Sequence, residues 1–535
     1  MPEPLQGSIG GGFGVKAYPH LARAELDLKE GRYDAASAQV IQHLRQIPNE
    51  PRGTALLGTI ALKTGALVQA EQFLRSALSL GATGVDVQRD LASAIYQQER
   101  LGEALHAFTF LESRSPDPQI LALKAITLDK LGRNADALEV HEALVGKQPN
   151  QPQYWIAYGH SLRAAARTDE AIAAYRRAVA IDDERGEAWW GLANIKSKVL
   201  TDEDIGTMET ALKRAIDLIN VVPLHFALGR AWDDRKDHSK AFDHFSEGNR
   251  LRAETINYAA DELTQEVDEF IDRFDPGAFK AAEDRPGEPT PVFLISMPRA
   301  GSTLLEQMLD RHPDIEAVGE LPYVRALLRS ALEIHTRRAP IKVPELIERL
   351  SPAETHAFGQ DYLNRARLHR RGNSRYFVDK MPMNWSDVLF IRKILPTARF
   401  IEIRRSAMDC CFSNYIHYFS RAHAASFDQR DIGRCYVDYA RLMDHIGGAA
   451  PGTLTQIRYE ALVEDPETQL RSLCSDLGLP FEGGMLRFYE SDRVVRTPSA
   501  EQVRRPLNRS GMDRWKPYAQ WLGPMRDALG PLADS

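Results

Sequence analysis

The stretch FLISMPRAGSTLLEQML, residues Phe293 to Leu309, has the pattern of a strand, a tight loop and a helix. Its apolar run ends at Pro298, and Arg-Ala-Gly-Ser-Thr follows before helical spacing begins. Gly301 permits a close backbone turn, and the free N–H groups at the start of the next helix favour an anion. Ser302 and Thr303 add hydroxyl donors, although an ordinary helix N-cap is the alternative interpretation. We therefore predict an anion-binding loop.

This loop differs from the phosphate-binding loop of nucleotide triphosphatases. That loop needs a lysine after its final glycine, and Ser302 stands at this place. The difference argues against a kinase or a triphosphatase, and we expect no bound magnesium or other metal. Fixed cations of the protein are expected to neutralise the anion instead.

Short apolar runs alternate with helical patterns from Pro291 onward. The expected pairs are PVFLIS before STLLEQML, YFVDK before MNWSDVLFIRKIL, RFIEIR before MDCCFSNYIHYF, and LTQIRYE before ETQLRSLCSDLG. Such alternation predicts an α/β domain with a mostly parallel sheet and a binding site at the carboxyl ends of its strands. Polar residues that we expect on this rim are Arg299, Ser302, Thr303, Lys380, Arg405 and Tyr459.

The segment FIEIRRSAMDCCFSNY contains a second candidate anion site. Arg405 leaves a strand, and Ser413 follows eight residues later inside the next expected helix. A guanidinium fork and a hydroxyl placed in this way can hold one terminal phosphate. Arg404 alternates to the other face, where a solvated or salt-bridged strand end is the better prediction. Asp409 is expected to pin the loop rather than to bind a metal.

The chain before residue 255 repeats itself with a period of about 34 residues. Equivalent turn positions are Gly31, Gly65, Glu99, Gly132, Ala166, Leu200 and Lys236. Alanine stands five residues after each of them except the sixth, where Ile205 replaces it and a distorted repeat is expected. Small residues on both sides of a turn let two antiparallel helices approach closely. The pattern predicts an all-α solenoid and resembles about seven tetratricopeptide repeats.

We expect four segments along the chain. They are a Gly-rich tail over residues 1–16, the repeat array over 17–255, a connecting helix and linker over 256–290, and the α/β domain over 291–535. The concave surface of the array is expected to bind a protein or peptide. The alternative is a scaffold that only supports or dimerises the second half.

The composition excludes several classes of protein. A chain of 535 residues with 43% hydrophobic and 26% charged residues is typical of a folded, soluble protein. The formal net charge of −7 argues against a mainly nucleic-acid-binding role. The four cysteines form no zinc template and are too few for a disulfide framework. Without an apolar run of about 18 residues, no membrane span is expected, and we predict a cytoplasmic protein.

Two separated motifs resemble those of sulfotransferases. The stretch Arg299-Ala-Gly-Ser-Thr-Leu resembles the loop that holds the donor's 5′-phosphosulfate, and the spacing from Arg405 to Ser413 resembles the 3′-phosphate motif. The string MPRAGSTLLEQMLDRHPDIEAVGEL is similar to protein-tyrosine sulfotransferases and to bacterial sulfotransferases joined to tetratricopeptide repeats. The resemblance implies a P-loop-like nucleotide-binding fold. It also implies transfer of the sulfuryl group of 3′-phosphoadenosine-5′-phosphosulfate (PAPS) to an acceptor hydroxyl.

The resemblance also implies roles for individual residues. Glu320 in AVGEL matches the catalytic acid of the family, and Lys380 in DKMPMNW matches its catalytic lysine. Glu320 would deprotonate the acceptor while Arg299 and Lys380 stabilise charge on the transferred group. The implied donor-binding residues are Arg299, Ala300, Gly301, Ser302, Thr303, Arg405, Ser413, Tyr459, Ser499 and Arg514.

Some positions depart from the family pattern and leave alternatives open. His417 stands where tyrosine sulfotransferases place a basic donor contact, and Ala300 stands where the loop often has serine. His312 and His417 are rival bases to Glu320, because many small-molecule sulfotransferases use histidine. The preferred acceptor is a tyrosine-like protein hydroxyl selected by the repeats. A glycan, lipid or metabolite acceptor is the alternative, and a repeat-based interaction protein with a silent catalytic domain is another.

Overall fold

A computed structural model describes residues 18–195, 198–284, 287–336, 340–420, 422–491, 502–509 and 511–534. The chain divides into two compact units, Met1–Ser115 and Pro116–Ser535. The segment that we predict as an N-terminal tail, residues 1–16, lies outside the described part. The other segment boundaries stay predictions. Among the described residues, no helix is long and apolar enough to cross a membrane.

The described part of the first unit consists of helices that pack consecutively along the chain. They are α1 (Pro19–Lys29), α2 (Tyr33–Gln46), α3 (Pro51–Thr64), α4 (Leu67–Ser79), α5 (Val85–Gln97) and α6 (Leu101–Arg114). A Cβ atom on Gly58 of α3 would lie 2.5 Å from Cγ of Leu74 on α4. The small residue therefore allows the two helices to approach closely, as the repeat pattern predicts.

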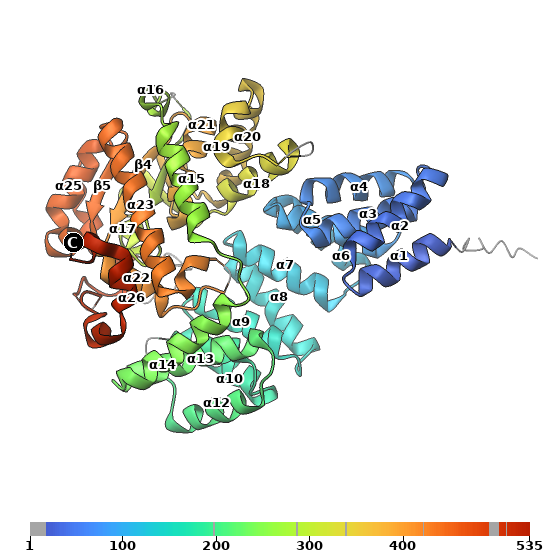
Figure 1. Cartoon of the computed structure of the whole chain (residues 1–535), viewed down its shortest axis with the longest axis horizontal. Helices are drawn as coiled ribbons and strands as arrows, with labels where there is room; N and C mark the ends of the chain where they lie inside the picture. Colours follow the sequence, from blue (N-terminus) through green and yellow to red (C-terminus); the bar gives the residue numbers. More distant parts are fainter. Residues whose placement is uncertain are drawn as a thin grey trace, which may run out of the picture. The chain divides into compact units, whose positions relative to one another are not determined.

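The second unit begins with the remaining repeats, drawn from cyan to green in Figure 1. Their helices are α7 (Pro118–Lys130), α8 (Asn134–Lys147), α9 (Pro152–Ala164), α10 (Thr168–Ile181), α11 (Gly186–Ala193), α12 (Asp202–Arg214), α13 (Leu218–Asp234) and α14 (His238–Ala253). The sixth repeat is distorted, as its sequence predicts. Helix α11 has only eight residues, and the residue with positive φ is Lys198 instead of Leu200.

A connecting helix, α15 (Ala260–Asp272), joins the repeats to the sheet-containing part and is followed by the short α16 (Pro276–Phe279). Helix α15 packs along α23 (Gln429–Ala449), as Figure 1 shows. Thr264 donates a 2.7 Å hydrogen bond to Asp438, and Arg441 forms a 2.6 Å ion pair with Asp268. The connection is therefore a packed helix over part of its length.

The second half contains a five-stranded parallel sheet in the order β2-β3-β1-β4-β5. Its strands are β1 (Thr290–Ile295), β2 (Ile315–Gly319), β3 (Tyr376–Asp379), β4 (Arg399–Arg404) and β5 (Leu454–Arg458). The four predicted strands are confirmed, whereas the edge strand β2 was not predicted. Its five residues include the charged Glu316, which is buried and accepts hydrogen bonds from Arg370 and the backbone of Arg371.

Helices cover both faces of the sheet. Val292 and Leu294 of β1 pack in one hydrophobic core with α17 and α25, whereas Phe293 faces Tyr362 of α20, with 5.5 Å between ring centroids. The central strands β1 and β3 are buried throughout, as their apolar runs predict, whereas in the edge strand β5 only Ile457 is buried. The helices are α17 (Ser302–Leu309), α18 (Tyr323–His335), α19 (Val343–Arg349), α20 (Pro352–Ala366), α21 (Val388–Ile394), α22 (Ala407–Tyr415), α23, α24 (Tyr459–Glu464), α25 (Pro466–Asp476) and α26 (Gly523–Leu529).

Short 3-10 helices complete this half. They are η1 (Arg367–His369), η2 (Pro382–Asp387), η3 (Ala424–Phe427), η4 (Gly483–Glu490), η5 (Gln502–Arg504), η6 (Lys516–Trp521) and η7 (Gly530–Asp534). The described loops at the carboxyl ends of β1, β2, β3 and β4 meet at one rim of the sheet. A binding site is expected at such a rim in a parallel α/β fold.

Candidate active site

The loop between β1 and α17 is held by an unusual backbone. Arg299 has a φ of 66° and Gly301 a φ of 100°, both in the left-handed region that favours glycine. A Cβ atom on Gly301 would also lie 2.4 Å from Cδ2 of Tyr459, so no larger residue fits. Gly301 is the N-cap of α17, and Ser302 is its first helical residue. The N-cap residue is therefore a glycine and not a serine or threonine, and Ser302 and Thr303 follow it in the first turn of the helix.

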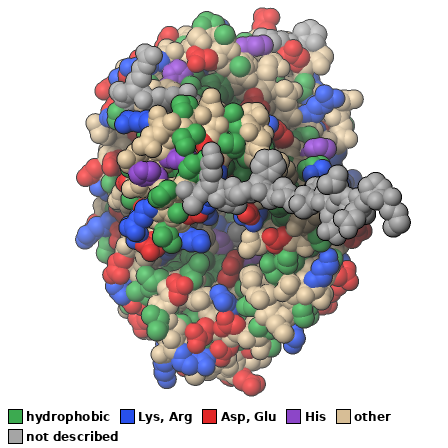
Figure 2. Space-filling view, turned by 90° about the vertical axis from the view of Figure 1, so that its right-hand side faces the viewer, with side chains coloured by type: hydrophobic (Ala, Val, Ile, Leu, Met, Phe, Trp, Pro, Cys, Tyr) green, Lys and Arg blue, Asp and Glu red, His purple; other side chains and the backbone are tan. Residues whose placement is uncertain are grey.

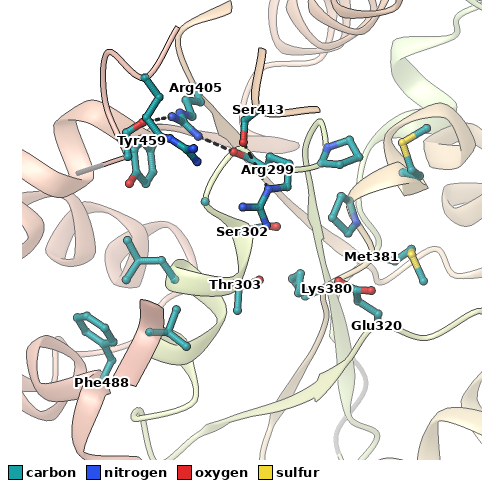
Figure 3. A pocket seen from close by; sticks show the side chains of 18 of the residues that line it. Arg299, Ser302, Thr303, Glu320, Lys380, Met381, Arg405, Ser413, Tyr459 and Phe488 are labelled. Carbon is teal, nitrogen blue, oxygen red and sulfur yellow. Dashed lines mark hydrogen bonds and ion pairs between the residues drawn. The ribbon is translucent and has the colours of Figure 1, made fainter. Parts of the chain in front are cut away.

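The predicted second anion motif lies directly beside this loop. Arg405 follows β4 and donates from Nη1 to the Arg299 carbonyl oxygen at 2.9 Å. Arg299 donates from Nε to Oγ of Ser413 in α22 at 3.4 Å. The Arg405 guanidinium also lies 5.2 Å from the ring centroid of Tyr459. Figure 3 shows these four side chains converging, although more than 100 residues separate Arg299 from Ser413.

The loops after β2 and β3 bring the predicted acid and lysine together. Lys380 Nζ forms an ion pair with Glu320 Oε1, and both residues are labelled in Figure 3. A second carboxylate, that of Glu306, lies 4.0 Å from Lys380 Nζ. The side chain of Lys380 is 1% exposed, whereas that of Glu320 is 40% exposed. A buried cation and an accessible carboxylate are thus adjacent, as the proposed chemistry requires.

The buried carboxyl group of Asp379, the residue before Lys380, connects the ends of two strands. Asp379 accepts hydrogen bonds from the Leu321 backbone N–H at 3.2 Å and from the Tyr362 hydroxyl at 2.8 Å. Burial raises the pKa of Asp379 to about 7, although both hydrogen bonds act in the opposite direction. These contacts fix the ends of β2 and β3 relative to each other, and hence the positions of Glu320 and Lys380.

The loop after residue 510 closes the arginine side of the site. The Asp409 carboxylate accepts the backbone N–H groups of Asp513 at 2.9 Å and Arg514 at 3.0 Å, so it holds this distant loop in place. Arg514 also forms a 3.2 Å ion pair with Asp233 of α13. Burial is the main reason that the pKa of Arg299 is lowered to about 10, and the nearby Arg514 and Arg405 contribute to this shift. The site is therefore strongly cationic.

Most of the predicted residues line one cavity of about 280 Å³. They are Arg299, Gly301, Ser302, Thr303, Glu320, Lys380, Arg405, Ser413, Tyr459 and Arg514. Ala300 is 1% exposed and does not line this cavity. Only its backbone could therefore contribute to the site. Ser499 lies outside the described residues. The structure thus brings together the described motif residues from six separate segments of the chain.

Two alternatives from the sequence are resolved by the geometry. His312 is buried away from the cavity, and its Nε2 atom lies 2.9 Å from the Pro480 carbonyl oxygen, so it cannot act as the base there. Arg404 forms ion pairs with Glu402 at 2.8 Å and Asp444 at 2.7 Å, as predicted for the opposite face of the strand.

Several cavity residues were not identified from the sequence. Met381, Phe419 and Phe488 form apolar parts of the lining, and His423 lies with them. They come from loops and short helices without periodic patterns, so no local signal identified them. Arg505 also lines the cavity. It belongs to the basic run VRRPLNR, which could have identified it.

Comparison with known proteins agrees with this architecture. Residues 291–483 match the sulfotransferase family. Residues 21–85, 89–154 and 152–195 match tetratricopeptide repeats. The chain therefore carries a sulfotransferase domain after an array of tetratricopeptide repeats, and the family supports sulfuryl transfer as the activity of this domain.

Individual relatives extend this finding. An uncharacterized protein of Aquifex aeolicus (strain VF5) is 28% identical over 521 residues, which cover 93% of this chain and 68% of the relative. Protein-tyrosine sulfotransferase 1 of Danio rerio is 24% identical over 239 residues, or 42% of this chain and 65% of that protein. The sulfotransferase domain of the Synechococcus PCC 7002 olefin synthase is 23% identical over 44% of this chain and 91% of that domain, with a TM-score of 0.32. The chain thus spans about two thirds of the length of the first two relatives.

Proposed function

We propose that the protein transfers the sulfuryl group of PAPS to an acceptor hydroxyl. The observation that carries this proposal is the single cavity that joins the loop of Arg299 to Ser302 with Arg405, Ser413 and the Glu320–Lys380 pair. Binding of a donor with two anionic groups needs the first set of residues, and the chemistry needs the second. A nucleotide triphosphatase would need the phosphate-binding loop after β1, but neither Arg405 and Ser413 nor the Glu320–Lys380 pair.

The residues present fit this donor. The helix N-terminus at Ser302 can receive a phosphate-like group, and the missing Cβ atom of Gly301 lets the Tyr459 ring pack against this loop. Arg405 lies beside it, and its buried Nε atom has no hydrogen-bond partner among the described residues. A buried donor without a partner is costly, and a bound anion would satisfy it. Phe488 and Leu507 add apolar surface for an adenosine.

The proposed chemistry uses Glu320 as the base. The bound donor supplies a sulfuryl group attached to a nucleotide phosphate, which leaves with the electrons of the broken bond. Glu320 accepts the proton of the acceptor hydroxyl as the acceptor oxygen bonds to sulfur. Lys380 and Arg299 hold positive charge beside the transferred group and the leaving oxygen. The ion pair between Lys380 and Glu320 supports a place for the ammonium group beside the reacting atoms.

The preferred acceptor is a tyrosine-like hydroxyl of a protein or peptide selected by the repeats. The exposure of Glu320 supports a macromolecular acceptor, because its carboxylate is accessible from outside the buried donor pocket. On the face seen in Figure 2, acidic and basic side chains are interspersed. This face therefore gives no preference for a strongly acidic or strongly basic acceptor.

The cysteines support a reducing compartment, for which we propose the cytoplasm. Cys410, Cys411, Cys435 and Cys474 are all buried and unpaired. Burial raises the pKa of the Cys410 thiol to about 12, so it stays protonated and unreactive at neutral pH. Free structural thiols are typical of reducing compartments.

The proposal is tested by incubating purified protein and cell lysate with PAPS that carries ³⁵S. The lysate is then separated into protein, glycan, lipid and small-molecule fractions. Label in protein that survives as tyrosine sulfate after hydrolysis supports the preferred acceptor, whereas label in another fraction replaces it. The lysate contains other enzymes that could transfer the label. A parallel incubation with the Glu320→Gln variant measures this background. Absence of label in every fraction, together with no binding of adenosine 3′,5′-bisphosphate, would contradict the proposed function.

A further inference from the structure

A small pocket lies between the repeats and the sulfotransferase domain, within the second unit. Its lining comes from both parts of the chain: Trp190, Asn194 and Arg230 from the repeats, and Arg299, Ser413, Ile416, His417 and Arg514 from the second half. It shares Arg299, Ser413 and Arg514 with the large cavity. Residues of the repeats therefore form one side of the proposed donor site, next to Ser413.

Arg230 is the cation that the repeats contribute to this wall. It lies in α13 and forms ion pairs with Asp233 at 3.4 Å and with Asp234 at 3.7 Å. Asp233 also binds Arg514 at 3.2 Å and accepts a 2.7 Å hydrogen bond from the Tyr518 hydroxyl. The Asp233 carboxylate thus pairs with two guanidinium groups at the pocket, that of Arg230 from the repeats and that of Arg514 from the second half.

The pocket carries an excess of positive charge. Its described lining includes three arginines and neither aspartate nor glutamate. Burial is the main reason that the pKa of Arg514 is lowered, and Arg230 is the next cause. The pKa of Arg299 is lowered by the same cluster. Cations that destabilise one another in a buried place are stabilised when a polyanion binds between them.

The adjacent histidine is engaged in packing. The ring centroid of His417 lies 5.5 Å from that of Trp190 and 4.7 Å from that of Phe419. His417 stands at the position where tyrosine sulfotransferases have a basic donor contact. The His417 ring packs between these two aromatic rings and is shorter than an arginine or lysine side chain. Arg230 lines the same pocket.

We infer that Arg230 binds the 3′-phosphate of the donor together with Arg405 and Ser413, so that a tetratricopeptide helix completes the donor site. The inference rests on the proposed function and deepens it. The ligand class is a nucleoside with phosphates on both its 3′ and 5′ oxygens. Asp233 is a positioning residue, because it touches Arg230 and Arg514 and orients both.

The test measures nucleotide affinity by calorimetry, with no need for turnover. Full-length protein is titrated with adenosine 3′,5′-bisphosphate and with adenosine 5′-phosphate, which lacks the 3′ group. We expect Arg230→Ala to weaken bisphosphate binding about 10-fold, because one charge-assisted contact is lost, and to leave monophosphate binding unchanged. Arg250→Ala is the matched control. Arg250 makes the same kind of pairs, with Glu247 at 2.7 Å and Glu254 at 2.5 Å, but does not line the pocket.

The outcomes separate the inference from the proposed function. Wild-type protein that binds neither nucleotide overturns both. Wild-type binding with an unchanged bisphosphate affinity in Arg230→Ala, or with an equal loss for both nucleotides, overturns the inference alone. If Arg230→Ala does not fold, Arg230→Gln keeps most of the side chain and provides the same comparison. An Arg230→Lys variant that recovers part of the selective loss supports a charge contact.

Discussion

The two ends of the large cavity are built in different ways. At the reaction end, Glu320 and Lys380 form one ion pair supported by short loops after β2 and β3. At the anchoring end, Arg299, Arg405 and Arg514 are held by carbonyl groups, a hydroxyl and carboxylates from distant parts of the chain. The difference indicates that charge at the anchoring end is shared among several residues, whereas each group at the reaction end has its own task.

The comparison is tested most strongly at the reaction end. We expect Glu320→Gln to lower kcat by ~10²–10⁴-fold, because the variant cannot accept the acceptor proton. The affinity for adenosine 3′,5′-bisphosphate should change little, since Glu320 lies away from the arginine cluster. Single-turnover transfer from labelled donor and calorimetry measure the two quantities. Near-normal transfer by Glu320→Gln would show that another group is the base.

Substitutions at the anchoring end should weaken nucleotide affinity more than they lower the rate of transfer. We expect Arg405→Ala to weaken bisphosphate binding by about 10- to 100-fold, because both a charge and its hydrogen bonds are lost. Arg404→Ala is the matched control, since this neighbour pairs with Glu402 and Asp444 on the opposite face. Calorimetry on both variants gives the comparison. Equal losses in the two variants would mean that strand β4, and not the Arg405 charge, determines binding.

The last effect concerns the pH dependence of stability and not the transfer reaction or donor binding. The pKa of Asp379 rises from its ordinary 3.8 to about 7 on folding, so the folded state binds more protons between these values. Stability should therefore fall as the pH rises through this window, by up to ~1.4 kcal/mol per pH unit from this group. The Asp379→Asn variant lacks the titration and should show a flatter curve. Urea unfolding at pH 4, 5, 6, 7 and 8 compares the two proteins, and identical slopes would contradict this assignment.

Sequence analysis predicted the parts of the site that depend on local chemistry. A glycine with left-handed φ, a helix that begins with Ser302 and an arginine after an apolar strand each leave a local pattern. Strand β2 was missed because it is short and contains a buried Glu316, whose charge is compensated by Arg370 and Arg371. The apolar cavity residues were missed because their packing depends on tertiary contacts.

Arg230 is a residue of the small pocket that the sequence analysis did not identify. Within its repeat, Arg230 is one of several surface arginines, and its (i, i+3) and (i, i+4) pairs with aspartates are common on helices. Only the packing of α13 against the residues around Arg514 brings Arg230 to the pocket that it shares with Arg299 and Ser413. Local spacing carries no information about such a contact between segments almost 300 residues apart.

The hydrogen bonds between α13, α14 and the second half have a consequence for protein engineering. Asp233 binds Arg514 and Tyr518, and Asn249 donates a 2.9 Å hydrogen bond to the Tyr415 carbonyl oxygen at the end of α22. A catalytic fragment that starts at the first strand would lose these partners and expose the aromatic surface that they cover. Repeats exchanged between relatives must therefore carry Asp233 and Asn249 with them. The useful place to cut and rejoin this chain lies inside the array, before α13.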